Sequence, residues 1–138
     1  MIETMEIVFP GGKRVNALYK NYVIQTDKPR ELGGDGSAPT SFDLFLASIG
    51  LCSGGFVLAF CEERGLSTEG LKLVLNIEKD PVSKMVGKIE IQIQLPPDFP
   101  EKYKEAVVKA AEQCTVKKHL LKPPVINVRV QAKSLDKK

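Results

Sequence analysis

The feature that most constrains the fold is an uncharged run from Leu44 to Cys61. It follows Pro39-Thr40-Ser41-Phe42-Asp43, where Thr40 and Asp43 have the spacing of the N-cap and N3 residues in a capping box. Gly65 comes directly after the charged turn at 62–64 and suits a C-terminal helix cap. The sequence therefore predicts one long helix from Thr40 to about Arg64 that is apolar on every side.

A helix of this kind either crosses a membrane or is covered by protein all around. Small residues interrupt the run at Ser48, Gly50 and 53–55, and no cluster of basic residues flanks it. We therefore expect the buried central helix of a soluble protein, covered in part by an oligomeric partner, and no membrane contact.

Strands are expected on both sides of this helix, because β-branched, aromatic or alternating apolar residues recur there. A turn-rich loop at 26–39 precedes the helix, and an amphipathic helix with apolar positions at 103, 106, 107, 110 and 111 leads to Cys114. Strands between separate helices predict an α+β fold with antiparallel sheets, as one domain over residues 1–138. The expected strands are 5–9, 14–20, 22–26, 71–77, 88–95 and Val125 to Ala132.

Charge and cysteine usage exclude several classes of protein. The 20 basic and 17 acidic residues are spread along the chain and leave a net charge of +3, so no nucleic-acid partner is predicted. The N-terminus is acidic and does not read as a signal peptide, and three cysteines are too few for a disulfide scaffold. We expect a reducing, cytoplasmic location.

The three thiols differ in which of them can meet. Cys61 follows Cys52 by nine residues, and nine steps of about 100° place it on the opposite side of the same helix. Cys114 is the other thiol that could meet Cys52, through tertiary contact. A redox pair is one interpretation, and cysteines packed as small hydrophobic side chains are the alternative. His119 and the three cysteines would make four zinc ligands, and His119 with one cysteine would make a Cys-His nucleophile pair. No Cys-x2-Cys spacing supports a metal site, so neither metal nor cofactor is expected.

The segment from Ala38 to Gly55, with Cys52 inside a helix of small residues, resembles the OsmC and organic hydroperoxide resistance superfamily. Ala110-Ala111-Glu112-Gln113-Cys114-Thr115-Val116 looks like the second cysteine box of that family, and Gly33-Gly34 lies where the family often has a Gly-Gly loop. The resemblance covers almost the whole chain. It implies an OsmC-like fold with a long central helix buried in an intertwined homodimer.

The resemblance also implies a thiol-dependent peroxidase for organic hydroperoxides, active in oxidative or osmotic stress defence. Cys52 would attack the peroxide, Cys114 would resolve the sulfenic acid as a disulfide, and an external dithiol would restore the enzyme. By position, the family's activating arginine maps onto Arg14 and its orienting carboxylate onto Asp43. Asp43 serves equally as a helix cap, and Lys13, Arg30 and Lys118 are alternative cations.

An apolar substrate pocket is expected at the dimer interface, around Phe42, Phe45 and Phe56. The chain departs from the best characterised peroxidase branch after Cys114, where Thr115-Val116-Lys117-Lys118 replaces Pro-Tyr-Ser-like residues. The alternative function is therefore a non-catalytic dimer of the same fold that binds a small apolar ligand or senses redox state.

Overall fold

The computed structural model describes residues 1–132, and its first unit is an antiparallel meander of three strands. These are β1 (Glu6–Gly11), β2 (Arg14–Tyr19) and β3 (Tyr22–Thr26). Lys20 and Asn21 both have positive φ, 48° and 67°, which gives β2 and β3 the tight turn that suits the twist of a hairpin. All three predicted strands are confirmed.

The loop from Asp27 to Pro39 is built around one buried carboxylate. Asp27 is 3% exposed and accepts hydrogen bonds from the backbone N–H groups of Lys28, Asp35 and Ser37 and from the Ser37 hydroxyl. The loop holds a short 3-10 helix, η1 (Arg30–Leu32). It packs so closely that a Cβ at Gly34 would overlap the Lys28 carbonyl.

The hydrogen bonds from Ser37, and then those from Lys28 and Asp35, lower the pKa of Asp27 from 3.8 to about 2. A carboxylate whose pKa is lower in the folded state stabilises the fold above its unfolded pKa, and this contribution disappears as the pH falls towards 2. Asp27→Asn is therefore expected to lower the melting temperature at pH 7, with a difference from wild type that shrinks below pH 4. Melting curves at pH 7, 4 and 2.5 check this, with the exposed Asp98→Asn as control. A difference that grows on acidification would contradict it.

The long helix α1 (Ser41–Glu63) begins and ends where the sequence predicts. The Asp43 N–H donates to the Thr40 hydroxyl at 3.1 Å, and the Thr40 N–H donates to the Asp43 carboxylate at 3.0 Å, which completes the capping box. At the other end Gly65 has φ of 63°, which glycine adopts without strain, and the Leu66 N–H closes the helix on the Cys61 carbonyl.

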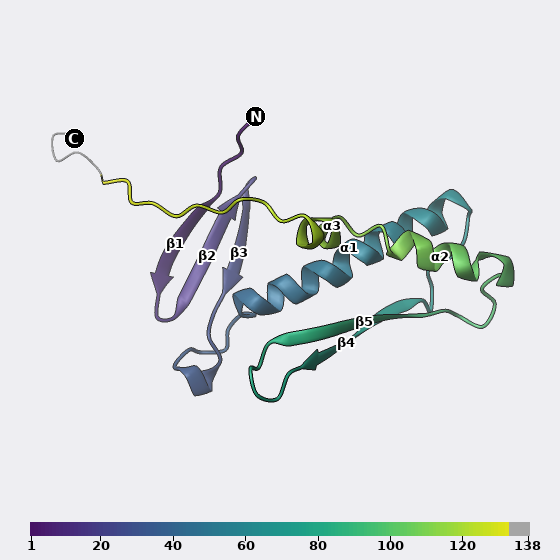
Figure 1. The fold of residues 1–138 in the computed structure, drawn as a ribbon, viewed down its shortest axis with the longest axis horizontal. Helices are drawn as coiled ribbons and strands as arrows, with labels where there is room; N and C mark the ends of the chain where they lie inside the picture. Colours follow the sequence, from purple (N-terminus) through teal and green to yellow (C-terminus); the bar gives the residue numbers. More distant parts are fainter. Residues whose placement is uncertain (133–138) are drawn as a thin grey trace.

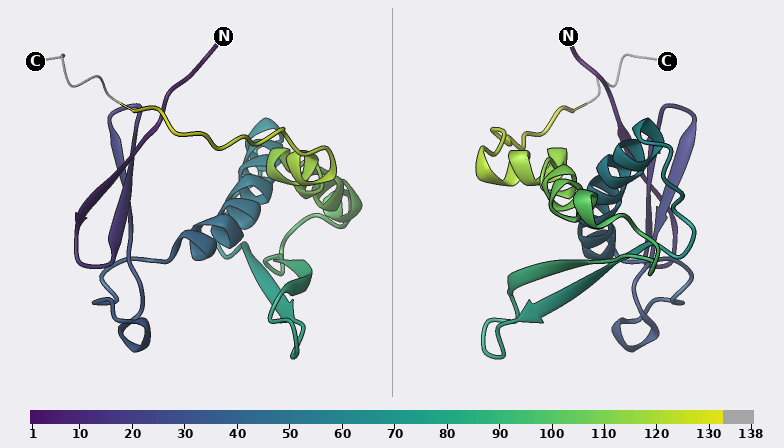
Figure 2. Two further views of the ribbon diagram at one scale, coloured as in Figure 1. Left: turned by 60° about the vertical axis from the view of Figure 1, so that its left-hand side comes forward. Right: turned by 90° about the vertical axis from the view of Figure 1, so that its right-hand side faces the viewer.

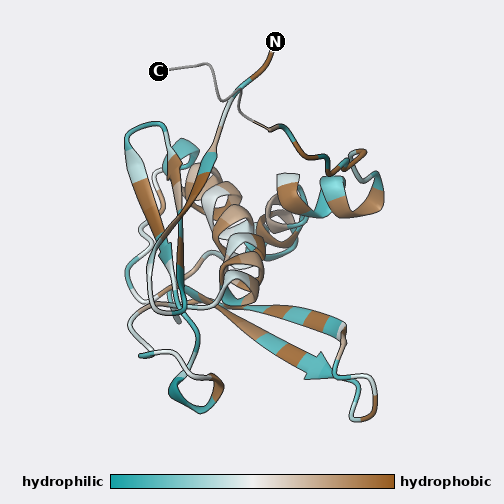
Figure 3. Ribbon diagram, turned by 90° about the vertical axis from the view of Figure 1, so that its left-hand side faces the viewer, coloured by the Kyte–Doolittle hydropathy of each residue, from teal (hydrophilic) through white to brown (hydrophobic). Residues whose placement is uncertain are grey.

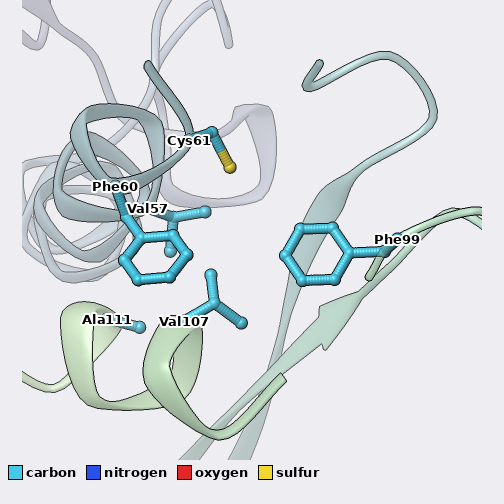
Figure 4. Close-up of a cluster of buried hydrophobic side chains, with 6 residues drawn as sticks. All are labelled: Val57, Phe60, Cys61, Phe99, Val107 and Ala111. Atoms are coloured by element: carbon cyan, nitrogen blue, oxygen red, sulfur yellow. The ribbon is translucent and has the colours of Figure 1, made fainter. Parts of the chain in front are cut away.

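An antiparallel hairpin and two short helices pack along α1 (Figure 1). They are β4 (Lys72–Lys79), β5 (Val86–Gln94), α2 (Lys104–Ala111), which follows a 3-10 turn η2 (Glu101–Tyr103), and α3 (Thr115–Leu121). The hydrophobic core lies where α1, α2 and the turn after β5 meet (Figure 4). It consists of Val57, Phe60, Cys61, Phe99, Val107 and Ala111.

Two sequence predictions need correction. The helix expected to carry Cys114 ends at Ala111, and Cys114 instead precedes α3 with extended backbone angles of −49° and 119°. The physical reason is that Cys114 caps α3, since its sulfur accepts from the Lys117 N–H. The second correction is Val125 to Ala132, which does not form a strand in this chain. Its side chains at 126, 128 and 130 are 81%, 95% and 93% exposed, and a strand needs a neighbour to bond with.

Much of α1 is open in the single chain. The β1–β3 sheet joins the rest through the loop at 27–40 and stands apart from the hairpin (Figures 1 and 2). Leu51 is 74% exposed and Leu58 is 47% exposed on α1, and added Cβ atoms at Gly54 and Gly55 would meet nothing within 4 Å. Apolar residues lie all along this helix (Figure 3), which is long and apolar enough to cross a membrane by length and composition alone. The faces that the sequence requires to be buried are therefore not all covered by one chain.

Candidate functional site

Cys52 lies midway along α1 and is half-buried. Its sulfur accepts a hydrogen bond from the Thr115 N–H at 3.1 Å, a contact that joins residues 63 positions apart in the sequence. Phe45 lies seven residues before Cys52 and Phe56 lies four residues after it, and both separations are close to whole numbers of helical turns. The thiol therefore faces the start of α3, on the side of α1 that also carries Phe45 and Phe56.

Cys114 directly precedes Thr115, the residue whose N–H bonds to the Cys52 sulfur. It is 2% exposed, and its thiol points to the Ile49 carbonyl of α1, 3.8 Å away. This thiol is also one of the groups that lower the pKa of Cys52. The two thiols that sequence spacing left free to meet therefore belong to segments that are in contact, and both cysteines are free.

The surroundings of Cys52 and Cys61 shift the pKa values of these two thiols in opposite directions. The backbone N–H of Val116 lowers the pKa of Cys52 most, and the Thr115 N–H and the Cys114 thiol add to this against an opposing effect of burial. Burial raises the pKa of Cys61, which is fully enclosed in the core, and Arg64 only partly offsets this. A thiolate is the reactive form of cysteine, so these surroundings favour reaction at Cys52 over reaction at Cys61.

Alkylation of the reduced protein is expected to modify Cys52 first and Cys61 last. The reason is that Cys52 is half-exposed with a lowered pKa, while Cys61 is inaccessible with a raised one. Peptide mapping after limiting iodoacetamide, repeated from pH 5 to 10, measures the order and the titration midpoint of each thiol. Early labelling of Cys61, or a Cys52 midpoint above the ordinary thiol value, would contradict the assignment.

The predicted activating residues lie in a different arrangement. The Arg14 guanidinium pairs with the Asp35 carboxylate at 3.0 Å, and Arg30 Nε donates to the Asp35 carbonyl oxygen at 3.4 Å. Asp43 is engaged in the capping box of α1 and does not contact Arg14 in this chain. Sequence reasoning missed Asp35, whose only signal was its place directly after Gly33-Gly34.

The other named side chains have local partners. Lys13 reaches the same loop, with its Cε 3.4 Å from the position of a Cβ on Gly33. His119 lies with Nδ1 2.8 Å from the Thr115 carbonyl, one turn back in α3. Lys118 is on the exposed surface of that helix. Within residues 1–132, no three or more His, Cys, Asp or Glu side chains gather closely enough to hold a metal ion.

Two adjoining apolar cavities lie near this site; Cys114 lines one of them and Cys52 lines neither. One of about 640 Å³ is lined by Phe42 and Phe45, whose ring centroids are 5.4 Å apart, together with the end of the β4–β5 loop. The other, of about 660 Å³, lies between β5 and α2 and is lined by Cys114 and Ser53. The two share Ile49, Ile89 and Leu120.

Phe56 is half-buried and lines neither of these two cavities. It follows Phe42 by fourteen residues of helix, a rise of about 21 Å. The structure therefore brings together two of the three predicted aromatic side chains.

The chain matches a known family in sequence and several solved structures in fold. The family described as OsmC-like protein matches residues 34–129, a span that includes both Cys52 and Cys114. No curated protein sequence matches the chain.

Solved structures share the fold at low sequence identity. An osmotic stress induced and detoxification response protein from Psychrobacter arcticus superposes with a TM-score of 0.71 at 21% identity, over 86% of this chain and 88% of that one. An OsmC-like protein from Mycoplasma pneumoniae gives 0.66 at 12% identity, over 88% of each chain. An organic hydroperoxide resistance protein OsmC from Legionella pneumophila gives 0.51 at 19% identity, over 87% and 89%. The predicted α+β fold with antiparallel sheets and a long central helix is confirmed.

Proposed function

Because the chain belongs to the OsmC-like protein family, we propose that it is a cysteine peroxidase that reduces organic hydroperoxides. The observation that carries the proposal is the hydrogen bond from the Thr115 N–H to Cys52, whose pKa is lowered, because it places the buried Cys114, the residue before Thr115, next to Cys52. Relatives of the same fold are named organic hydroperoxide resistance proteins, which fits this chemistry. The decisive test is hydroperoxide consumption by wild type, Cys52→Ser and Cys114→Ser in the presence of a small dithiol.

The reaction uses both thiols in turn. The Cys52 thiolate attacks the terminal oxygen of the hydroperoxide, the O–O bond breaks, and the leaving alkoxide takes a proton to become an alcohol. Cys52 is then a sulfenic acid, and the Cys114 sulfur attacks the Cys52 sulfur and expels water. The result is a disulfide, and two thiol–disulfide exchanges with an external dithiol return both cysteines to the reduced state.

The N–H groups at the start of α3 have a direct role in this scheme. The Thr115 N–H donates to the Cys52 sulfur, and the N–H groups of Thr115 and Val116 both lower its pKa, so they stabilise the thiolate before attack without a metal or a cofactor. The adjoining apolar cavities accept the organic part of the substrate, with Phe42 and Phe45 at one end. Phe56 would contribute only to the part of the pocket that a second subunit completes.

Arg14 is the proposed activating cation. In this chain its guanidinium pairs with Asp35, beside the loop around Asp27, and Arg14 is not among the groups that shift the pKa of Cys52. The proposal therefore requires Arg14 to reach the thiol in the dimer, with Asp35 as the orienting carboxylate and Asp43 as the helix cap. Arg14→Ala is expected to raise the midpoint of Cys52 alkylation and slow peroxide attack, with little change in melting temperature because the side chain is exposed.

Asp43→Asn is the matched variant for this test. It should cost about 0.5 to 2 kcal/mol of stability through the lost cap and leave the thiol titration unchanged. A Cys52 titration that is the same in Arg14→Ala as in wild type would show that Arg14 is not the activating cation. Lys13, Arg30 and Lys118 would then be the candidates.

The active form is proposed to be a cytoplasmic homodimer. Exposed apolar side chains on α1, together with the unpaired segment at 125–132, leave surfaces that one chain does not cover. A second copy that packs on α1 and pairs with this segment would bury them, which makes membrane insertion of α1 unnecessary.

A further inference from the structure

Ser53 is a buried polar side chain that the reaction scheme does not use. It is 1% exposed, and it and Asp27 are the buried polar or charged residues within the described part of the chain. Burying a hydroxyl group is unfavourable unless the group makes a hydrogen bond. Alanine would fill the same helical position with higher helix propensity, so the hydroxyl needs a structural or functional reason.

The Ser53 hydroxyl donates to the Ala111 carbonyl at 3.0 Å, a bond between residues 58 positions apart. Ala111 is the last residue of α2, where helix carbonyls lack partners further along the helix. Ser53 therefore supplies the partner for a carbonyl that would otherwise be buried without one. The same bond fixes the end of α2 against α1, three residues before Cys114.

Two further contacts attach the segment at 111–115 to α1. The Cys114 thiol points to the Ile49 carbonyl, and the Thr115 N–H donates to the Cys52 sulfur. Residues 49, 52 and 53 lie on one face of α1, because they have the i, i+3 and i+4 spacing. Of these attachments only the Ser53 bond involves no sulfur atom, so it is the one that stays chemically unchanged when the thiols react.

We propose that Ser53 is a positioning residue, whose hydroxyl anchors the end of α2 so that the Cys114 sulfur is held against Cys52 for disulfide formation. The inference rests on the proposed role of the two thiols. Two groups held close before reaction lose less conformational entropy on forming a bond, so a lost anchor weakens disulfide formation. Ser53 and Cys114 line the same cavity, which gives the segment room to move once the anchor is absent.

The test is a redox titration of the Cys52–Cys114 pair against dithiothreitol. In this equilibrium the protein disulfide takes two electrons and two protons from the dithiol, which becomes a cyclic disulfide, and no peroxide is involved. Alkylation of remaining thiols and peptide mapping give the oxidised fraction at each ratio. Ser53→Ala is expected to lower the equilibrium constant for disulfide formation about threefold to tenfold, and tenfold corresponds to about 30 mV.

Ser48→Ala is the matched control on the same helix. The Ser48 hydroxyl donates to the Phe45 carbonyl at 2.6 Å within its own helix, so its loss should leave the redox equilibrium unchanged. Ser53→Thr keeps the hydroxyl beside a cavity and should restore the wild-type value. Melting curves of all variants accompany the titrations, to separate a shift in redox equilibrium from a loss of stability.

An equilibrium constant in Ser53→Ala equal to wild type, even with a lower melting temperature, would overturn the inference. An equal shift in Ser48→Ala, or the absence of any Cys52–Cys114 disulfide in wild type, would overturn it as well. Hydroperoxide consumption is measured separately on the same proteins. A wild type that consumes no hydroperoxide but shows the Ser53→Ala shift would support the positioning role and reject the peroxidase.

Discussion

Cys52→Ser is expected to lower organic hydroperoxide consumption by at least about 1000-fold in the presence of a small dithiol. The reason is that no other described thiol combines exposure with a lowered pKa, and removal of a covalent nucleophile leaves only binding and environment to accelerate the reaction. Initial rates with cumene hydroperoxide measure the loss. Wild type that consumes no hydroperoxide, or Cys52→Ser that keeps the wild-type rate, would contradict the proposed function.

Two further variants separate the roles of the remaining thiols. Cys114→Ser without reductant should consume one equivalent of hydroperoxide and stop as a Cys52 sulfenic acid that dimedone traps, whereas wild type should stop as a disulfide. Serine keeps a side-chain oxygen that can cap α3, so the variant tests the thiol chemistry with the helix intact. Cys61→Ala should keep turnover, because Cys61 lies in the core away from the other two thiols.

The start of α1 shows what sequence alone predicts well. Thr40 and Asp43 bond only to each other and to nearby backbone, so their spacing determines the capping box without information from the rest of the fold. The opposite placement of Cys52 and Cys61 follows from helix periodicity in the same way. The hairpin at 72–94 was predictable because its alternation of apolar and polar residues is local.

The end of α2 shows what sequence alone could not predict. The amphipathic pattern before Cys114 continues without a glycine or proline, so nothing local marks the break after Ala111. The break coincides with tertiary contacts, from Ser53 to Ala111 and from Cys52 to Thr115. Asp35 was missed for the same reason, since it reaches Arg14 from a loop that hydrogen bonds to Asp27 hold in place.

The segment at 125–132 has the alternation of a strand and no strand partner in its own chain. The strand that this alternation predicts does not form here, because strand formation depends on a neighbour that the sequence does not specify. The segment leaves α3 and runs back towards the β1–β3 sheet (Figures 1 and 2). A segment of this kind becomes a strand when a second copy brings an open sheet edge beside it.

Leu51→Lys is expected to prevent formation of the proposed dimer, or to raise its dissociation constant about 100-fold or more. Leu51 is 74% exposed in the single chain and lies on the open face of α1, so a dimer that covers this helix would bury an unpaired ammonium group. Sedimentation velocity at micromolar concentration measures the result. Because dimers of this kind often have no stable folded monomer, the variant should also melt at a lower temperature.

Val82→Lys is the matched control, since Val82 is 90% exposed but lies in the turn between β4 and β5. Both variants replace an exposed apolar side chain with lysine. If the protein were a monomer, neither substitution should change its stability or its sedimentation. Only coverage of α1 by a second copy makes Leu51→Lys the damaging one. A wild-type protein that sediments as a folded monomer, or a Leu51→Lys variant that behaves like Val82→Lys, would reject the dimer and require another partner for the open face of α1.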